Sequence, residues 1–160
     1  MHNLKNEIYL SIIFLISIVS IISAYFIEYI LGYQPCNLCL IERIPYGLSI
    51  ILIIMNFKFK ANEKFFYILL ILVFTFSFLI SSYHLGIEQG FFQESTVCDT
   101  KNTINTISKE EILKQLSERT ISCKDVTFKI FGLSLTSINV FISLIIIIFL
   151  TKIYSNEKNK

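Results

Sequence analysis

The 160-residue sequence has no tryptophan, only five glycines and two prolines, and a formal charge of only +2 from 14 basic and 12 acidic side chains. A charge this small, scattered along the chain, argues against a nucleic-acid partner. The sequence also lacks internal repeats and low-complexity tracts, apart from its isoleucine-rich segments. The length suits one domain, and we expect residues 1–160 to form it.

Polar stripes of helical period are also missing, although 54% of the residues are hydrophobic. The apolar residues come instead in four blocks, whereas the helices of a soluble bundle, which is the alternative, would each need a polar face. A helix needs about 20 apolar residues to cross the hydrocarbon core of a membrane. The first and third blocks reach that length alone, and the other two reach it with their flanking residues.

We therefore predict an all-α integral membrane protein, a bundle of four transmembrane helices whose backbone groups are satisfied within each helix. The predicted spans are residues 8–31, 40–57, 65–83 and 133–152, and the predicted outward-facing loops are residues 32–43 and 84–132. No small-residue cleavage site follows the first block, which is also too long for a signal-peptide core, so we interpret it as a retained anchor.

Lysines are concentrated at one end of the predicted spans, whereas the link at 32–42 contains no lysine or arginine. The positive-inside rule therefore places both termini and the link at 58–64 in the cytoplasm. The long loop carries six basic residues, but long loops cross the membrane largely regardless of charge.

Cysteine is absent from the predicted cytoplasmic segments, because Cys36, Cys39, Cys98 and Cys123 all fall in the outer loops. Outside a bacterial inner membrane lies an oxidising compartment in which disulfides persist. We therefore expect a multi-pass inner-membrane protein whose periplasmic cysteines carry disulfide chemistry. A protein that exports reductant would need cysteines in the spans or on both sides, and this chain has neither.

Four cysteines allow three pairings, and the sequence leaves the resting pairing open. The closeness of Cys36 and Cys39 in the C-x-x-C motif favours a pair there and leaves Cys98 with Cys123. A disulfide between the latter two would close a long loop and contribute about 3 kcal/mol to stability. A disulfide between Cys36 and Cys39 would close a very small loop and would therefore stabilise the fold little. A redox role is favoured for that pair.

A zinc site is the alternative use of these cysteines. Structural zinc is usually held by two close pairs of Cys or His, and here only one such pair is present. Cys98 and Cys123 are far apart in the sequence, and no spare histidine lies near either of them to complete a second zinc-binding pair. We therefore expect no metal.

The residues around C-x-x-C favour redox chemistry. Pro35 cannot extend a helix backwards, so the second span is expected to begin near the motif. A cysteine in a first helical turn is exposed to the positive end of the helix dipole, which favours a thiolate. Arg43 lies four residues after Cys39 and thus on the same helix face, where it either stabilises a thiolate or extends to the membrane interface.

The segments "PCNLCLIER" (35–43), "SYHLGIEQGFF" (82–92) and "FKIFGLSLTSINVFISL" (128–144), with the second cysteine pair, resemble the DsbB family (disulfide-bond-formation protein B). These are four-span inner-membrane thiol:quinone oxidoreductases. The resemblance implies that this chain re-oxidises a periplasmic thioredoxin-fold carrier of the DsbA type and passes the electrons to ubiquinone or menaquinone. The partners it implies are that carrier and the membrane lipid.

The resemblance also implies roles for individual residues. Cys98 would form the mixed disulfide with the partner, and Cys123 would pair with Cys98 at rest and exchange with Cys36. Cys39 would be the thiolate facing the quinone. Arg43 would supply positive charge beside Cys39. His84 would donate a hydrogen bond to a quinone oxygen, with an interfacial histidine that caps the third span as the alternative.

The chain departs from many relatives at two places. It has "STVC" where they carry a proline before the third cysteine, and "GFF" where they carry a tryptophan, so Phe91 or Phe92 would serve as the interfacial aromatic residue. Residues 108–118 are expected to form a short amphipathic helix on the membrane surface or in solvent. Glu28 and Glu88 are interpreted as interfacial charges without an assigned role.

Two further alternatives stay open at this level. A four-span scaffold with purely structural disulfides would carry the same cysteines without electron transfer. A protein like vitamin K epoxide reductase would share the chemistry, but its active C-x-x-C lies at the start of a late span rather than the second.

Overall fold

The structure, a computed structural model, describes residues 2–59, 63–93, 98, 122–124, 128–130 and 132–158. Within this part of the chain four long helices and one small hairpin form. They are α1 (His2–Tyr29), α2 (Asn37–Lys58), α3 (Glu63–Glu88), α5 (Leu135–Lys158), β1 (Lys129–Ile130) and β2 (Leu133–Ser134). All four helices are long and apolar enough to cross a membrane. The prediction of a four-transmembrane-helix bundle is confirmed, and the protein is a multi-pass membrane protein. The expected surface helix at 108–118 lies outside the described residues.

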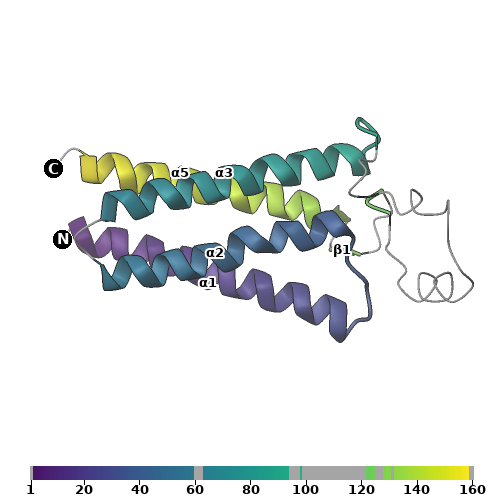
Figure 1. Cartoon of the computed structure of the whole chain (residues 1–160), viewed down its shortest axis with the longest axis horizontal. Coiled ribbons are helices and arrows are strands. Elements are labelled where there is room, and N and C mark those ends of the chain that lie inside the picture. The colour runs from purple at the N-terminus through teal and green to yellow at the C-terminus, as the bar shows by residue number, and fades with distance from the viewer. Residues whose placement is uncertain are drawn as a thin grey trace, which may run out of the picture.

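The four helices run side by side along the long axis of the molecule (Figure 1). The start of α1, the end of α2, the start of α3 and the end of α5 lie at one end of the bundle. The start of α2, the end of α3 and the start of α5 lie at the opposite end, which we call the cysteine end. α3 packs most extensively on α5, and α2 packs on α3 and α1, whereas α1 barely touches α5.

Both α2 and α3 extend further toward the cysteine end than the spans predicted from hydropathy. α2 begins at Asn37 because Pro35 cannot continue a helix and Cys36 takes the N-cap position. α3 continues to Glu88 and ends in a Schellman motif, in which Gly90 adopts a φ of 79° and Phe91 N–H donates to the Gly86 carbonyl oxygen at 2.8 Å. The helices therefore carry polar residues of the predicted loops into the bundle.

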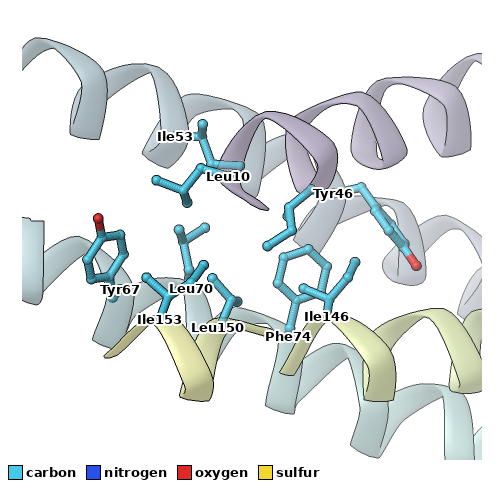
Figure 2. Packing of buried hydrophobic residues seen from close by; sticks show 10 residues of the cluster. Leu10, Tyr46, Ile53, Tyr67, Leu70, Phe74, Ile146, Leu150 and Ile153 are labelled. Atoms are coloured by element: carbon cyan, nitrogen blue, oxygen red, sulfur yellow. The ribbon is translucent and has the colours of Figure 1, made fainter. Parts of the chain in front are cut away.

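The core lies between the four helices, each of which contributes buried side chains to it (Figure 2). It consists of Leu10, Ile13, Tyr46, Ile53, Tyr67, Leu70, Phe74, Ile146, Leu150 and Ile153. Lipid is as apolar as these side chains, so association depends on close packing and on hydrogen bonds between helices. Two serine pairs provide such bonds, Ser17 with Ser49 at 2.9 Å and Ser77 with Ser143 at 3.1 Å.

The outward faces of the helices are apolar as well. Only 17% to 33% of the residues in the most apolar stretch of each span are buried within the protein. The exposed residues include Leu15, Ile22, Leu72, Leu79 and Ile148. Exposed apolar surface all around a bundle is expected where the surrounding solvent is lipid.

Candidate functional site at the cysteine end

The C-x-x-C motif forms the N-terminus of α2. Cys36 has the extended backbone conformation of an N-cap residue, with φ −74° and ψ 167°, and its sulfur accepts a hydrogen bond from the Cys39 backbone N–H at 3.3 Å. The two sulfurs are 2.9 Å apart and not bonded to one another. The hydrogen bond with the Cys39 thiol lowers the pKa of Cys36 to about 4, with a further contribution from His84, although burial acts in the opposite direction. The reduced pair is thus arranged to carry a negative charge at Cys36.

The second cysteine pair is present as a disulfide between Cys98 and Cys123. Both of these residues are buried, and they belong to the same hydrophobic cluster as Cys36, with Leu38 and Ile87 between the helix ends. The fold thus brings together two cysteine pairs from separate loops. Sulfur exchange between two pairs requires this proximity.

His84 lies inside α3, one turn before its end, and is 1% exposed. Its Nδ1 lies 2.7 Å from Glu42 Oε1, the distance of a ring N–H that donates to a carboxylate. Its Nε2 lies 3.6 Å from Cys36 Sγ and 3.9 Å from Glu88 Oε1. His84 therefore lies within α3, with its ring buried between α2 and α3 beside the thiols, and its role stays a prediction.

The carboxylates around His84 are held by polar groups of α5. Thr136 Oγ1 donates to Glu88 Oε1 at 2.6 Å, and Asn139 Nδ2 donates to Glu42 Oε2 at 2.7 Å. The hydroxyl of Tyr46 in turn donates to Asn139 Oδ1. Buried carboxylates are costly unless they are hydrogen-bonded, so this network stabilises their position near the thiols.

Arg43 lies in the turn that follows Cys39 and contacts α1 rather than water. Its guanidinium forms an ion pair with Glu28 at 2.5 Å and lies 5.2 Å from the centre of the Tyr25 ring. The two charged side chains are only 18% and 20% exposed. Glu28 and Glu88, which the sequence left without an assigned role, both have partners here, since Glu28 pairs with Arg43 and Glu88 contacts His84.

A cavity of about 340 Å³ opens between the weakly packed α1 and α5, and we call it the thiol cavity. Its walls are largely apolar, and its polar end is formed by residues of the site just described. The apolar wall includes Val19, Ile21, Ala24, Ile27, Leu135, Ile138 and Ile142, and the polar end includes Cys36, Cys39, Glu42, Arg43, His84, Glu88 and Asn139. A largely apolar cavity with a few convergent polar groups is typical of a site for a small molecule.

All the site residues predicted from the sequence converge at this end. Cys36, Cys39, Arg43 and His84 line the thiol cavity together with Cys123, and Cys98 lies in the adjoining cluster. Asn139, Thr136 and the carboxylate of Glu42 also belong to the site, although no motif in the sequence indicated them. These residues could have been found from the sequence because each is a polar residue in or beside a predicted membrane span. Such residues usually have a functional role.

These observations define a multi-pass membrane protein with a thiol pair and a disulfide in one buried cluster beside an apolar cavity. The family described as Disulfide bond formation protein DsbB matches residues 6–153. The chain belongs to this family, as its resemblance indicated, and family membership supports an oxidoreductase role in disulfide formation. An uncharacterized protein of Rickettsia prowazekii (strain Madrid E) is 33% identical over 137 residues, which cover 84% of this chain and 80% of that protein. No solved structure matches the chain significantly.

Proposed function

We propose that this protein re-oxidises a periplasmic DsbA-type dithiol carrier and passes the electrons to a membrane quinone. The observation that carries the proposal is the shared cluster of the Cys98–Cys123 disulfide with the N-terminus of the C-x-x-C helix. A thiolate must reach a disulfide sulfur for exchange to occur. The shared cluster supports transfer between the two pairs without a large movement of the helices.

The proposed exchange begins when a thiolate of the carrier attacks Cys98 and Cys123 leaves as a thiolate. Cys123 then attacks Cys36 of an oxidised Cys36–Cys39 pair, and Cys39 leaves as a thiolate. The second carrier thiol attacks the carrier sulfur of the mixed disulfide, and Cys98 leaves as a thiolate. Cys98 then attacks Cys123, the Cys123–Cys36 bond breaks, and Cys36 leaves as a thiolate. The net result is one new disulfide in the carrier and two electrons on the Cys36/Cys39 pair.

The two cysteines of C-x-x-C differ in when they carry charge. In the reduced pair, the hydrogen bond from Cys39 lowers the pKa of Cys36 and favours the thiolate there. When Cys36 is joined to Cys123, Cys39 is the thiol left free, and Cys39 lines the thiol cavity beside Arg43. This supports the role of Cys39 as the thiolate that faces the electron acceptor.

The residues of the thiol cavity fit a quinone. The apolar walls of α1 and α5 suit a flat ring and its tail, and the cavity opens where these two helices are weakly packed. Arg43 and His84 would hold the quinone oxygens, and a bound quinone supplies an acceptor for two electrons and two protons. Arg43 lines the same cavity as Cys39 and would offset negative charge there, and the Glu42–His84 hydrogen bond lies beside the thiols.

The energetics require an acceptor of this kind. A DsbA-type dithiol has a reduction potential of about −120 mV and is itself a strong oxidant. An ordinary protein disulfide cannot re-oxidise it, because each 30 mV in the unfavourable direction costs about 1.4 kcal/mol. We also propose that the cysteine end faces the periplasm and both termini face the cytoplasm, which the positive-inside rule supports.

The test is an anaerobic assay of the full-length protein in detergent with a reduced DsbA-type carrier and a soluble quinone. We expect quinone reduction that matches carrier oxidation, and loss of both in Cys39→Ser and Cys98→Ser. Ser11→Ala, an exposed change at the far end of α1, is the control and should keep full activity. Quinone that stays oxidised, with inert disulfides, would support the structural scaffold instead.

A further inference from the structure

The fold places a third metal-binding side chain beside the C-x-x-C pair. The sulfurs of Cys36 and Cys39 and a ring nitrogen of His84 all lie within 4.8 Å of one another. The argument against zinc from the sequence was that only one close pair of metal-binding residues, Cys36 and Cys39, is present. Packing of α3 on α2 removes that argument, because it brings the ring to the N-terminus of α2.

The spacing of these atoms suits a tetrahedral Zn²⁺ ion. Zn–S bonds of about 2.3 Å and Zn–N bonds of about 2.0 Å put a sulfur and a nitrogen about 3.5 Å apart and two sulfurs about 3.8 Å apart. Cys36 Sγ and His84 Nε2 are 3.6 Å apart. The two sulfurs, at 2.9 Å, would separate by rotation of the Cys39 side chain in the first turn of α2.

Glu42 accepts the hydrogen bond that the second ring nitrogen of a metal-bound histidine usually donates. A zinc-bound histidine almost always donates its other ring N–H to a carboxylate or carbonyl, which fixes the ring and its tautomer. Glu42 Oε1 occupies that position, 2.7 Å from His84 Nδ1, and Asn139 holds the other oxygen of Glu42 at 2.7 Å. Nε2, the nitrogen directed toward Cys36, is thereby left as the free ligand.

Glu88 lies beside the three ligands but outside their cluster, and its carboxylate would fill the fourth position by turning toward the sulfurs. Its side chain is 6% exposed, its Oε1 lies 3.9 Å from His84 Nε2, and its Oε2 is buried without a hydrogen-bond partner among the described residues. A buried carboxylate oxygen without a partner is costly. Coordination of a cation at this position would satisfy it.

We propose that the reduced Cys36/Cys39 pair and His84 bind a thiophilic divalent cation, with Zn²⁺ as the prototype and Glu88 as the fourth ligand. Binding releases the remaining thiol protons to solution and transfers no electrons, because Zn²⁺ has no redox chemistry. A Cys36–Cys39 disulfide has no thiolate to offer, so only the reduced protein forms the site. The bound ion holds both sulfurs and stops their oxidation.

The test needs neither quinone nor carrier, so its outcome is independent of the proposed function. Full-length protein carrying Cys98→Ser and Cys123→Ser, in detergent, retains only the C-x-x-C thiols. Zn²⁺ affinity is measured by competition with a chromophoric chelator, for the reduced and the oxidised protein. Co²⁺ in place of Zn²⁺ reports tetrahedral thiolate ligation through its visible spectrum.

We expect one Zn²⁺ per reduced chain and none per oxidised chain. In the same background His84→Ala should weaken binding more than tenfold, and Glu42→Gln should weaken it about 10–100-fold, the effect of losing a carboxylate behind a metal-bound histidine. His2→Ala, which removes the other histidine of the chain, is the matched control and should bind as the parent does.

Equal affinity in the parent and in His84→Ala would overturn the proposal, since a bare dithiol would then explain all binding. The absence of zinc binding by the reduced parent would overturn it as well. Glu42→Gln keeps the side-chain volume, so a weaker affinity in a variant that stays monodisperse and helical separates loss of the site from loss of the fold.

Discussion

His84 Nδ1 lies 2.7 Å from Glu42 Oε1, and this contact joins α3 to α2 directly beside the C-x-x-C thiols. The carboxylate fixes the orientation of the ring, and Asn139 of α5 fixes the carboxylate. Three helices therefore control the position of one imidazole.

Glu42→Gln is expected to slow quinone reduction by at least about tenfold, because a hydrogen bond to a charged partner contributes roughly 1.5–3 kcal/mol. The initial exchange between the carrier and Cys98 should be unaffected, since Cys98 is not part of the His84 network. Stopped-flow absorbance of the quinone and acid-quenched trapping of the mixed disulfide measure the two steps separately. Glu63→Gln, at the opposite end of α3, is the matched control, and equal slowing in both variants would contradict a specific role for Glu42.

The Cys36 thiol is expected to titrate well below its ordinary pKa of 9.0, at about 4. Because the folded value lies below the unfolded one, ionisation stabilises the reduced fold fully above about pH 9, and this stabilisation is lost as the pH falls toward 4. Ultraviolet absorbance of the thiolate, in protein carrying Cys98→Ser and Cys123→Ser, measures the titration. Cys39→Ala should raise the pKa of Cys36, because it removes the hydrogen bond that lowers it most.

Asn139→Leu is expected to destabilise the bundle by about 1–3 kcal/mol, because it removes the donor to the buried Glu42 Oε2 and the acceptor of the Tyr46 hydroxyl. Reversible unfolding in mixed micelles measures the change. Thr151→Val, at an exposed position on the same helix, should change stability by less than about 0.5 kcal/mol. A similar small effect for Asn139→Leu would show that the network does not stabilise the fold.

Gly86→Ala is expected to destabilise the end of α3 by about 1–3 kcal/mol, the usual cost of overpacking. A Cβ at Gly86 would overlap the ring of Phe92, with Cε2 at 2.5 Å, and would push that ring away from Tyr83. A double-mutant cycle with Phe92→Ala measures the coupling. The alanine at Gly86 should be tolerated once the Phe92 ring is absent, and strictly additive effects would contradict this explanation.

The membrane fold could be predicted from the sequence because it depends on local properties. Length and continuous apolar character determine the four spans, and Pro35 before Cys36 determines where α2 begins. α3 continues five residues beyond the span predicted at 65–83, and hydropathy does not indicate this, because polar residues such as His84 and Glu88 lower it whether they face water or a buried site. Hydropathy depends on residue type alone and carries no information about the tertiary contacts of a polar side chain.

The sequence by itself determined the four apolar helices, the C-x-x-C motif at a helix N-terminus, and the presence of Arg43 on the same face as Cys39. Only the tertiary structure decided that His84 lies between Glu42 and Cys36, that Glu28 pairs with Arg43, and that Cys98 and Cys123 join the cluster of Cys36. The physical reason is that a helix fixes contacts three or four residues apart. Contacts between helices depend instead on how their faces pack, and in a membrane that packing is selected by close fit and by the need to satisfy buried polar groups.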